Sequence, residues 1–164
     1  MYTPLRRLSG GVDRLVQPMA IVILTGMTIA IALQILFRVL FDALPWTEEV
    51  SRYLLVWVTF LGAILAYGRG VHIAVTFVVN AFPKVFQDGL KVVAVIGALV
   101  FFAVGLIFSI RYMGTQSAQV SASLRMPMPA VYSVMPVSFA ILILHGVTHL
   151  LSIVQGKDDE EAAS

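Results

Sequence analysis

Glu48, Glu49 and Arg52 lie within five residues of one another, immediately before a long apolar stretch. Arg52 follows Glu48 by four residues and Glu49 by three, so a helix places all three on one face. Carboxylates favour the positive end of a helix dipole, and Thr47 is a suitable N-cap for a helix starting here. The cluster has two interpretations: charged side chains that pair with one another at the start of a helix, or a charged rim that contacts another protein. The two interpretations are compatible.

Histidines form a second set of candidates. His145 and His149 are four residues apart, as a metal or haem site could require, but this spacing also suits interfacial histidines or contacts with a neighbouring helix. His72, Thr76 and Asn80 recur every four residues among apolar neighbours and predict one polar stripe that faces headgroups or a partner. Cysteine is absent, which excludes disulfides and thiolate metal sites. We expect no cofactor and no metal.

The elements that must position these residues are long and apolar. The 164-residue chain is 59% hydrophobic and 12% charged, whereas soluble domains carry about 25% charged residues. Three stretches contain no Asp, Glu, Lys or Arg: Met19–Phe37, Val92–Ile110 and Ala130–Val154. Their lengths approach or exceed the roughly 20 helical residues that cross a bilayer. Tyr53–Tyr67 reaches that length if its helix begins near Thr47. The sequence therefore predicts an all-α integral membrane protein with four transmembrane helices.

The ends of these helices also follow from the sequence. Pro18 suits a helix start, and the segment Gly68-Arg69-Gly70 predicts a break after the second span. Residues 71–82 are too short to cross a bilayer, so we expect a short amphipathic interfacial helix there. Pro136 predicts a kink early in the last span. The four predicted transmembrane helices cover about residues 18–40, 47–68, 85–112 and 130–154.

Basic residues indicate the orientation, with seven on the side of the two termini and four on the other side. Residues 1–17 are then a basic cytoplasmic arm, followed by a retained signal anchor as the first span. Residues 18–154 form the transmembrane domain, and residues 155–164 an acidic cytoplasmic tail. Trp46 and Tyr112 are predicted anchors at the membrane interface. The net charge of +2 comes from scattered residues, so we expect no nucleic-acid partner.

Groups that could do chemistry inside the membrane are scarce. Enzymes and ion-coupled pumps place ionisable groups deep in their spans, where such groups are costly. No predicted span carries a carboxylate at mid-depth. The sequence therefore predicts a protein that is not an enzyme and has no catalytic residue, and it argues against an exporter that works alone.

A series of motifs resembles the small membrane subunit of tripartite ATP-independent periplasmic (TRAP) transporters, the DctQ-like family. The motifs are Trp46-Thr47-Glu48-Glu49, Arg52, Trp57, Phe60-Leu61-Gly62-Ala63 and Arg69-Gly70-Val71-His72-Ile73. Near the start of the last span, the pattern of Pro127 or Pro129 followed by Tyr132 and Pro136 is also similar to that family. The resemblance covers about residues 15–155.

The resemblance implies a scaffold subunit of a bacterial inner-membrane, sodium-coupled elevator transporter for organic acids such as C4-dicarboxylates or sialic acids. It implies an obligate large membrane subunit, which carries the substrate and sodium sites, and a periplasmic binding protein that docks transiently. Candidate partner contacts are Glu48, Glu49, Arg52, Arg69, His72 and Arg125. Two alternatives stay open: a haem-bearing membrane anchor of a respiratory oxidoreductase, which needs His145 or His149, and a small homo-oligomeric exporter.

Overall fold

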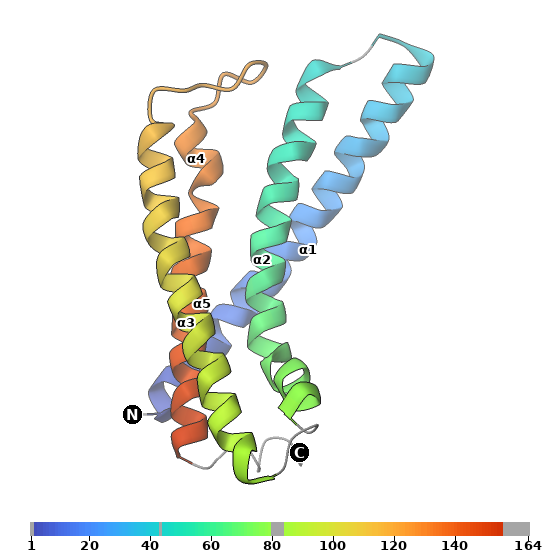
Figure 1. The fold of residues 1–164 in the computed structure, drawn as a ribbon. Helices are drawn as coiled ribbons and strands as arrows, with labels where there is room; N and C mark the ends of the chain where they lie inside the picture. The colour runs from blue at the N-terminus through green and yellow to red at the C-terminus, as the bar shows by residue number, and fades with distance from the viewer. Residues whose placement is uncertain (1, 43, 80–83, 156–164) are drawn as a thin grey trace.

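The structure, a computed structural model, describes residues 2–42, 44–79 and 84–155. Within these ranges, it describes the backbone but not the side chains of residues 2–4, 6, 69–79 and 84–88. Its helices are α1 (Tyr2–Leu40), α2 (Pro45–Val79), α3 (Lys84–Thr115), α4 (Met128–Tyr132) and α5 (Val134–Val154). The described residues also contain one isolated β-bridge, between Val120 and Pro127. The predicted all-α class is confirmed (Figure 1).

Four helical stretches are long and apolar enough to cross a membrane: Arg7–Leu40, Pro45–Gly68, Gly89–Thr115 and Met128–Val154. The prediction of four spans is therefore confirmed by length and composition. The fourth stretch contains both α4 and α5, which meet at Ser133. Pro136 explains this junction, because its ring clashes with the carbonyl four residues earlier, at Tyr132, where α4 ends.

The first helix begins much earlier than the sequence predicted. α1 starts at Tyr2 and carries Pro18 in its interior, so Pro18 does not begin the helix. A proline inside a helix removes one backbone hydrogen bond and strains the preceding turn. The segment before Pro18 is held by tertiary packing, because Val16 is 5% exposed and belongs to the hydrophobic core.

The second helix differs from its prediction at both ends. α2 begins at Pro45, and Thr47 does not act as its N-cap: its hydroxyl donates to the Leu44 carbonyl over 2.7 Å. The predicted break at Gly68-Arg69-Gly70 is wrong, since α2 continues to Val79. A glycine inside a helix costs only about 1 kcal/mol relative to alanine. Residues 71–79 thus continue α2, and residues 80–82 of the predicted interfacial helix lie outside the described residues.

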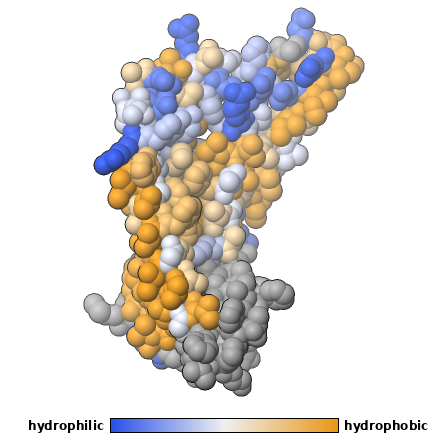
Figure 2. All heavy atoms as spheres, viewed as in Figure 1, coloured by the Kyte–Doolittle hydropathy of each residue, from blue (hydrophilic) through white to orange (hydrophobic). Residues whose placement is uncertain are grey.

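The long helices pack as two antiparallel pairs, α1 with α2 and α3 with α5 (Figure 1). The core joins all four long helices through Val16, Leu61, Ile64, Phe102 and Leu142. Figure 2 shows apolar surface along the sides of the bundle. Hydrophilic residues gather at the end that carries the α1–α2 turn and the segment between α3 and α4. This distribution fits a bundle whose sides face lipid and whose end at the α1–α2 turn is polar.

Close packing of α3 on α5 depends on two glycines. A Cβ atom added at Gly105 would lie 2.5 Å from Cε1 of Phe139, and one at Gly146 would lie 2.7 Å from Cδ2 of Leu99. Both distances are too short for a real side chain. The glycines therefore let the two backbones approach closely, as small residues do between helices in membranes.

Candidate partner-binding site

Glu49 is the centre of a polar cluster at the start of α2. Its Oε1 accepts hydrogen bonds from the Tyr53 hydroxyl (2.6 Å) and the Ala122 backbone N–H (3.1 Å). Its Oε2 accepts from the backbone N–H groups of Ser123 (2.9 Å) and Leu124 (3.0 Å). We call this arrangement the Glu49 clasp: Glu49, Tyr53 and the N–H groups of residues 122–124. It ties the start of α2 to a segment more than 70 residues later.

The clasped segment has a defined fold of its own. The backbone N–H of Ser121 donates to the Met126 carbonyl (2.8 Å), and the Met126 N–H donates to the Ser121 hydroxyl (3.1 Å). The Met128 N–H donates to the Gln119 carbonyl over 3.0 Å. Arg125, at the turn between them, has a φ of 53°, in the left-handed region that non-glycine residues rarely adopt. This turn is therefore a fixed, exposed feature with a guanidinium at its tip.

Glu48 and Arg52 form a separate pair on the outside of α2. Their closest N–O distance is 3.0 Å, and their side chains are 63% and 69% exposed. Exposed pairs of this kind stabilise a helix by only about 0.3–0.5 kcal/mol. The sequence left open whether the cluster pairs internally or meets a partner. The structure separates the two carboxylates: Glu48 pairs with Arg52, whereas Glu49 holds the distant segment.

Further contacts fix this end of the molecule. The Trp57 indole N–H donates to the Val131 carbonyl over 3.0 Å and links α2 to α4. The rings of Tyr112 and Tyr132 lie 5.0 Å apart and link α3 to α4. Trp46 and Tyr112, the predicted membrane-interface anchors, are both exposed. The anchoring role of these two residues stays a prediction.

Two other predicted residues lie at the opposite end of α2. Arg69 and His72 belong to the helical backbone that continues beyond Gly68, but their side chains lie outside the described part of the chain. The structure therefore does not bring them together with the Glu49 clasp, which lies at the start of the same helix.

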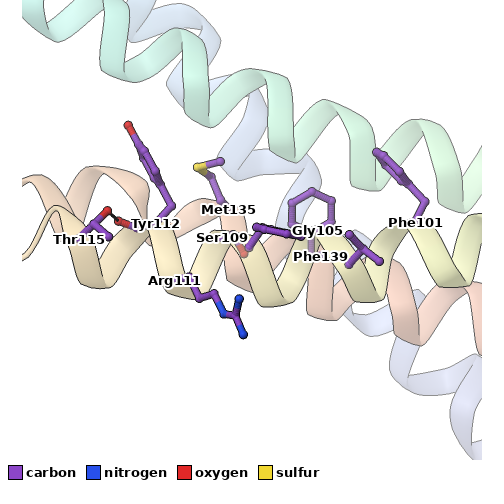
Figure 3. A pocket seen from close by; sticks show the side chains of 10 residues that line it. Phe101, Gly105, Ser109, Arg111, Tyr112, Thr115, Met135 and Phe139 are labelled. Atoms are coloured by element: carbon purple, nitrogen blue, oxygen red, sulfur yellow. Dashed lines mark hydrogen bonds between the residues drawn. The ribbon is translucent and has the colours of Figure 1, made fainter.

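A shallow apolar groove runs along α3 and α5 (Figure 3). Its volume is about 630 Å³. Tyr112 and Arg111 leave α3 in different directions beside it (Figure 3). The hydroxyl of Ser109 donates to the Leu106 carbonyl of its own helix, so it offers little to a polar ligand. The groove lacks the converging polar groups that a substrate site uses.

The two histidines of α5 differ in exposure, since His145 is buried and His149 is half-buried. His145 is 3% exposed, with Nδ1 2.9 Å from the Ile141 carbonyl and Nε2 3.1 Å from Oδ1 of Asp13. Its two ring nitrogens are therefore engaged, which leaves neither for haem iron. The His149 ring packs against Tyr67, with centroids 5.8 Å apart. Among the described residues, no group of three His, Cys, Asp or Glu side chains could hold a metal ion.

Sequence reasoning missed Asp13 and the role of Gly68. Asp13 is the only carboxylate in residues 1–41. Its position as a single acidic residue just before an apolar span was the signal that could have identified it as a candidate. A Cβ atom at Gly68 would lie 3.1 Å from Cδ2 of His145 and 3.2 Å from Oδ2 of Asp13. Gly68 is thus a packing residue where α1, α2 and α5 meet, which explains why it does not end the helix.

Four long apolar helices, with a polar cluster where α2 begins, define a small multi-pass membrane protein. Residues 27–156 match the family described as tripartite ATP-independent periplasmic transporters, DctQ component, and the chain belongs to that family. The family is a component of transporters and is not a family of enzymes. The resemblance noted in the sequence is confirmed.

The chain is also similar to a protein of Haemophilus influenzae whose name assigns it to the TRAP transporter small permease proteins. The two are 38% identical over 88 residues. The matched part covers 53% of this chain and 55% of that relative, so the match spans about half of each protein.

Proposed function

We propose that this chain is the scaffold subunit of a sodium-coupled TRAP secondary transporter for organic acids such as C4-dicarboxylates or sialic acids. The observation that carries the proposal is the lack of charged side chains across the middle of every span, in a member of the DctQ family. Sodium and carboxylate substrates need polar groups inside the membrane. The obligate large membrane subunit would supply them, and this chain would support it.

One face of α2 is suited to contact the large subunit. This face consists of five exposed residues at helical spacing: Arg52, Leu55, Thr59, Gly62 and Ala66. A Cβ atom at Gly62 would meet nothing within 4 Å. Small residues let a second helix approach closely in a membrane, where packing drives association. This α2 face would therefore enlarge the fixed scaffold against which the transport domain of the large subunit moves.

The polar end of the bundle is the proposed docking surface for the periplasmic binding protein. The exposed pair of Glu48 and Arg52 and the turn at Arg125 belong to this end. The Glu49 clasp holds the turn against α2. A rigid turn costs less entropy to bind than a mobile one, so the clasp would favour a transient but specific contact.

The proposed localisation is the bacterial inner membrane, with both termini in the cytoplasm. The basic residues on the cytoplasmic side are Arg6, Arg7, Arg14, Arg69, Lys84, Lys91 and Lys157, and those on the periplasmic side are Arg38, Arg52, Arg111 and Arg125. The 24 residues from Pro45 to Gly68 already suffice to span. The end of α2, with Arg69 and His72, would then lie on the cytoplasmic side of the membrane.

A mild-detergent purification of the tagged chain from its native membrane tests the proposal, with mass spectrometry of the proteins that come with it. We expect a large polytopic membrane protein in stoichiometric amounts and a periplasmic binding protein in smaller amounts. The variant Gly62→Leu should lose the large subunit, whereas Gly97→Leu, also on an open helix surface, should retain it. Purification of the chain alone, or with a flavin or iron–sulfur subunit, would contradict the proposal.

A further inference from the structure

The groove along α3 and α5 is apolar for most of its length and charged near one end. Its α3 side is a single helix face, formed at intervals of three and four residues by Phe101, Val104, Phe108, Arg111 and Thr115. At a rise of 1.5 Å per residue, this face is about 21 Å long. Of the described residues that line the groove, only Arg111 is charged. The groove therefore combines a long apolar surface with one guanidinium near its end.

The depth of the groove matches one leaflet of a bilayer. The candidate span Gly89–Thr115 has Phe102 as its middle residue, which places Phe101 near the centre of the membrane. Arg111 follows that middle residue at a distance of about 14 Å along the helix. Half of a hydrocarbon core of about 30 Å is about 15 Å. The guanidinium therefore lies at the boundary between acyl chains and headgroups, and the apolar part of the groove lies on its hydrocarbon side.

The shape of the groove suits an acyl chain better than a second helix. Gly105 leaves no free space for a partner, because the Phe139 ring already fills it: an added Cβ atom would lie 2.5 Å from Cε1 of that ring (Figure 3). The rings of Phe101 and Phe108 line the groove and are 66% and 62% exposed. Helices that pack closely in membranes present small residues to each other. Bulky rings keep a second helix at a distance, whereas a flexible chain can lie between them.

Arg111 is available to an anion. Its exposed side chain leaves α3 in a different direction from that of Tyr112 (Figure 3). Within the described residues, Arg111 forms no ion pair. Two carboxylates at the same end of the bundle have other partners, since Glu48 pairs with Arg52 and Glu49 belongs to the clasp. A guanidinium is always charged in proteins and matches a phosphate with two parallel N–H donors. Its position at headgroup depth thus favours a phosphate group.

We propose that this groove binds one molecule of an anionic phospholipid. One acyl chain lies along α3 from Arg111 towards Phe101, and the phosphate accepts hydrogen bonds from the Arg111 guanidinium. A lipid with net negative charge is favoured over a zwitterionic lipid, whose own ammonium group already compensates its phosphate. The inference requires only that the chain spans a bilayer, so it does not depend on the proposed transport function.

Native mass spectrometry of the full-length chain measures the bound lipid directly. The chain is released from nanodiscs with equal amounts of phosphatidylglycerol and phosphatidylcholine that carry the same acyl chains. We expect one retained phosphatidylglycerol per chain. Arg111→Gln should lower the ratio of retained phosphatidylglycerol to phosphatidylcholine about tenfold, the effect of losing one hydrogen bond to a charged group.

Arg38→Gln is the matched control for charge. It removes an exposed arginine in the last turn of α1, at the same end of the bundle but outside the groove. We expect the lipid ratio of this variant to equal that of the natural chain. An equal fall in both variants would show attraction to the whole charged end rather than a site. That result, or an unchanged ratio in Arg111→Gln, would overturn the proposal.

The apolar part of the groove is tested by filling it. Val104 and Ile110 are both exposed on α3, at 46% and 52%, but only Val104 lines the groove. Val104→Trp should displace the bound lipid, whereas Ile110→Trp should retain it. Lipid retained equally in both variants would overturn the proposal. So would loss of a co-purifying membrane protein from Val104→Trp with the lipid retained, because a protein would then cover the groove. Arg111→Gln changes no packing, so it tests the site even where Val104→Trp fails to fold.

A photoreactive phosphatidylglycerol locates the acyl chain. With a diazirine near the end of one chain, we expect crosslinks on α3 close to Phe101 and on α5 close to Phe139. Val104→Trp should remove these crosslinks. Labelling spread evenly over the exposed apolar residues of α1 and α3 would refute a defined lipid site.

Discussion

Replacing Gly105 by alanine should weaken the packing of α3 on α5. The new Cβ atom would lie 2.5 to 2.9 Å from three ring atoms of Phe139. Carbon atoms attract one another best at about 3.5–4.0 Å, so the ring would have to move by roughly 1 Å. It cannot move freely, because it packs edge-on against Phe60 and Phe101, with centroid distances of 5.7 and 6.3 Å. Overpacking of this kind typically costs about 1–3 kcal/mol.

Gly97 supplies the control on the same helix. An added Cβ there would meet nothing within 4 Å. Gly97→Ala therefore shows only the helix-propensity gain of about 1 kcal/mol, and Gly105→Ala should have the same gain. The difference between the two variants isolates the overpacking cost. We expect Gly105→Ala to unfold more easily than Gly97→Ala by about 1–3 kcal/mol in free energy. The measurement is equilibrium unfolding in mild detergent, followed by tryptophan fluorescence. Equal stabilities would refute the close α3–α5 packing.

Three further substitutions test other parts of the structure. Glu49→Gln replaces one acceptor oxygen of the clasp by a donor, so hydrogen exchange of the backbone amides of residues 122–124 should accelerate. Glu48→Gln should leave this exchange unchanged, and unchanged exchange in both variants would contradict the clasp. Trp57→Phe removes the hydrogen bond to Val131 and should lower the free energy of unfolding by about 1 kcal/mol; no loss in chemical unfolding would count against that bond. Gly62→Leu should leave the melting temperature of the isolated chain unchanged but abolish co-purification of the large subunit, and intact complex would exclude this face.

The membrane spans could be predicted from the sequence because they depend on local composition. A run of about 20 apolar residues has few alternatives to a helix across a bilayer. The kink near Pro136 could be predicted for a similar reason, since the ring acts on its own turn. Family membership also followed from local motifs between Trp46 and Ile73.

The remaining features depend on contacts between distant segments. By local rules Pro18 starts a helix and Gly68 ends one, but tertiary packing retained both inside helices. The sequence singled out Glu49 beside Arg52, but it gave no sign of the contacts that Glu49 makes with the segment after α3. The pairing of Asp13 with His145 spans 132 residues, and periodicity within one helix carries no information on such a contact.

The central claim, that this chain supports transport without providing the path, is tested most directly by uptake into proteoliposomes. The purified large subunit and binding protein would be compared with and without this chain, and with this chain alone, under an inward sodium gradient. Radiolabelled C4-dicarboxylate and sialic acid would serve as substrates. The account predicts uptake of one of them only when all three proteins are present. Full uptake without this chain, or uptake by this chain alone, would contradict it.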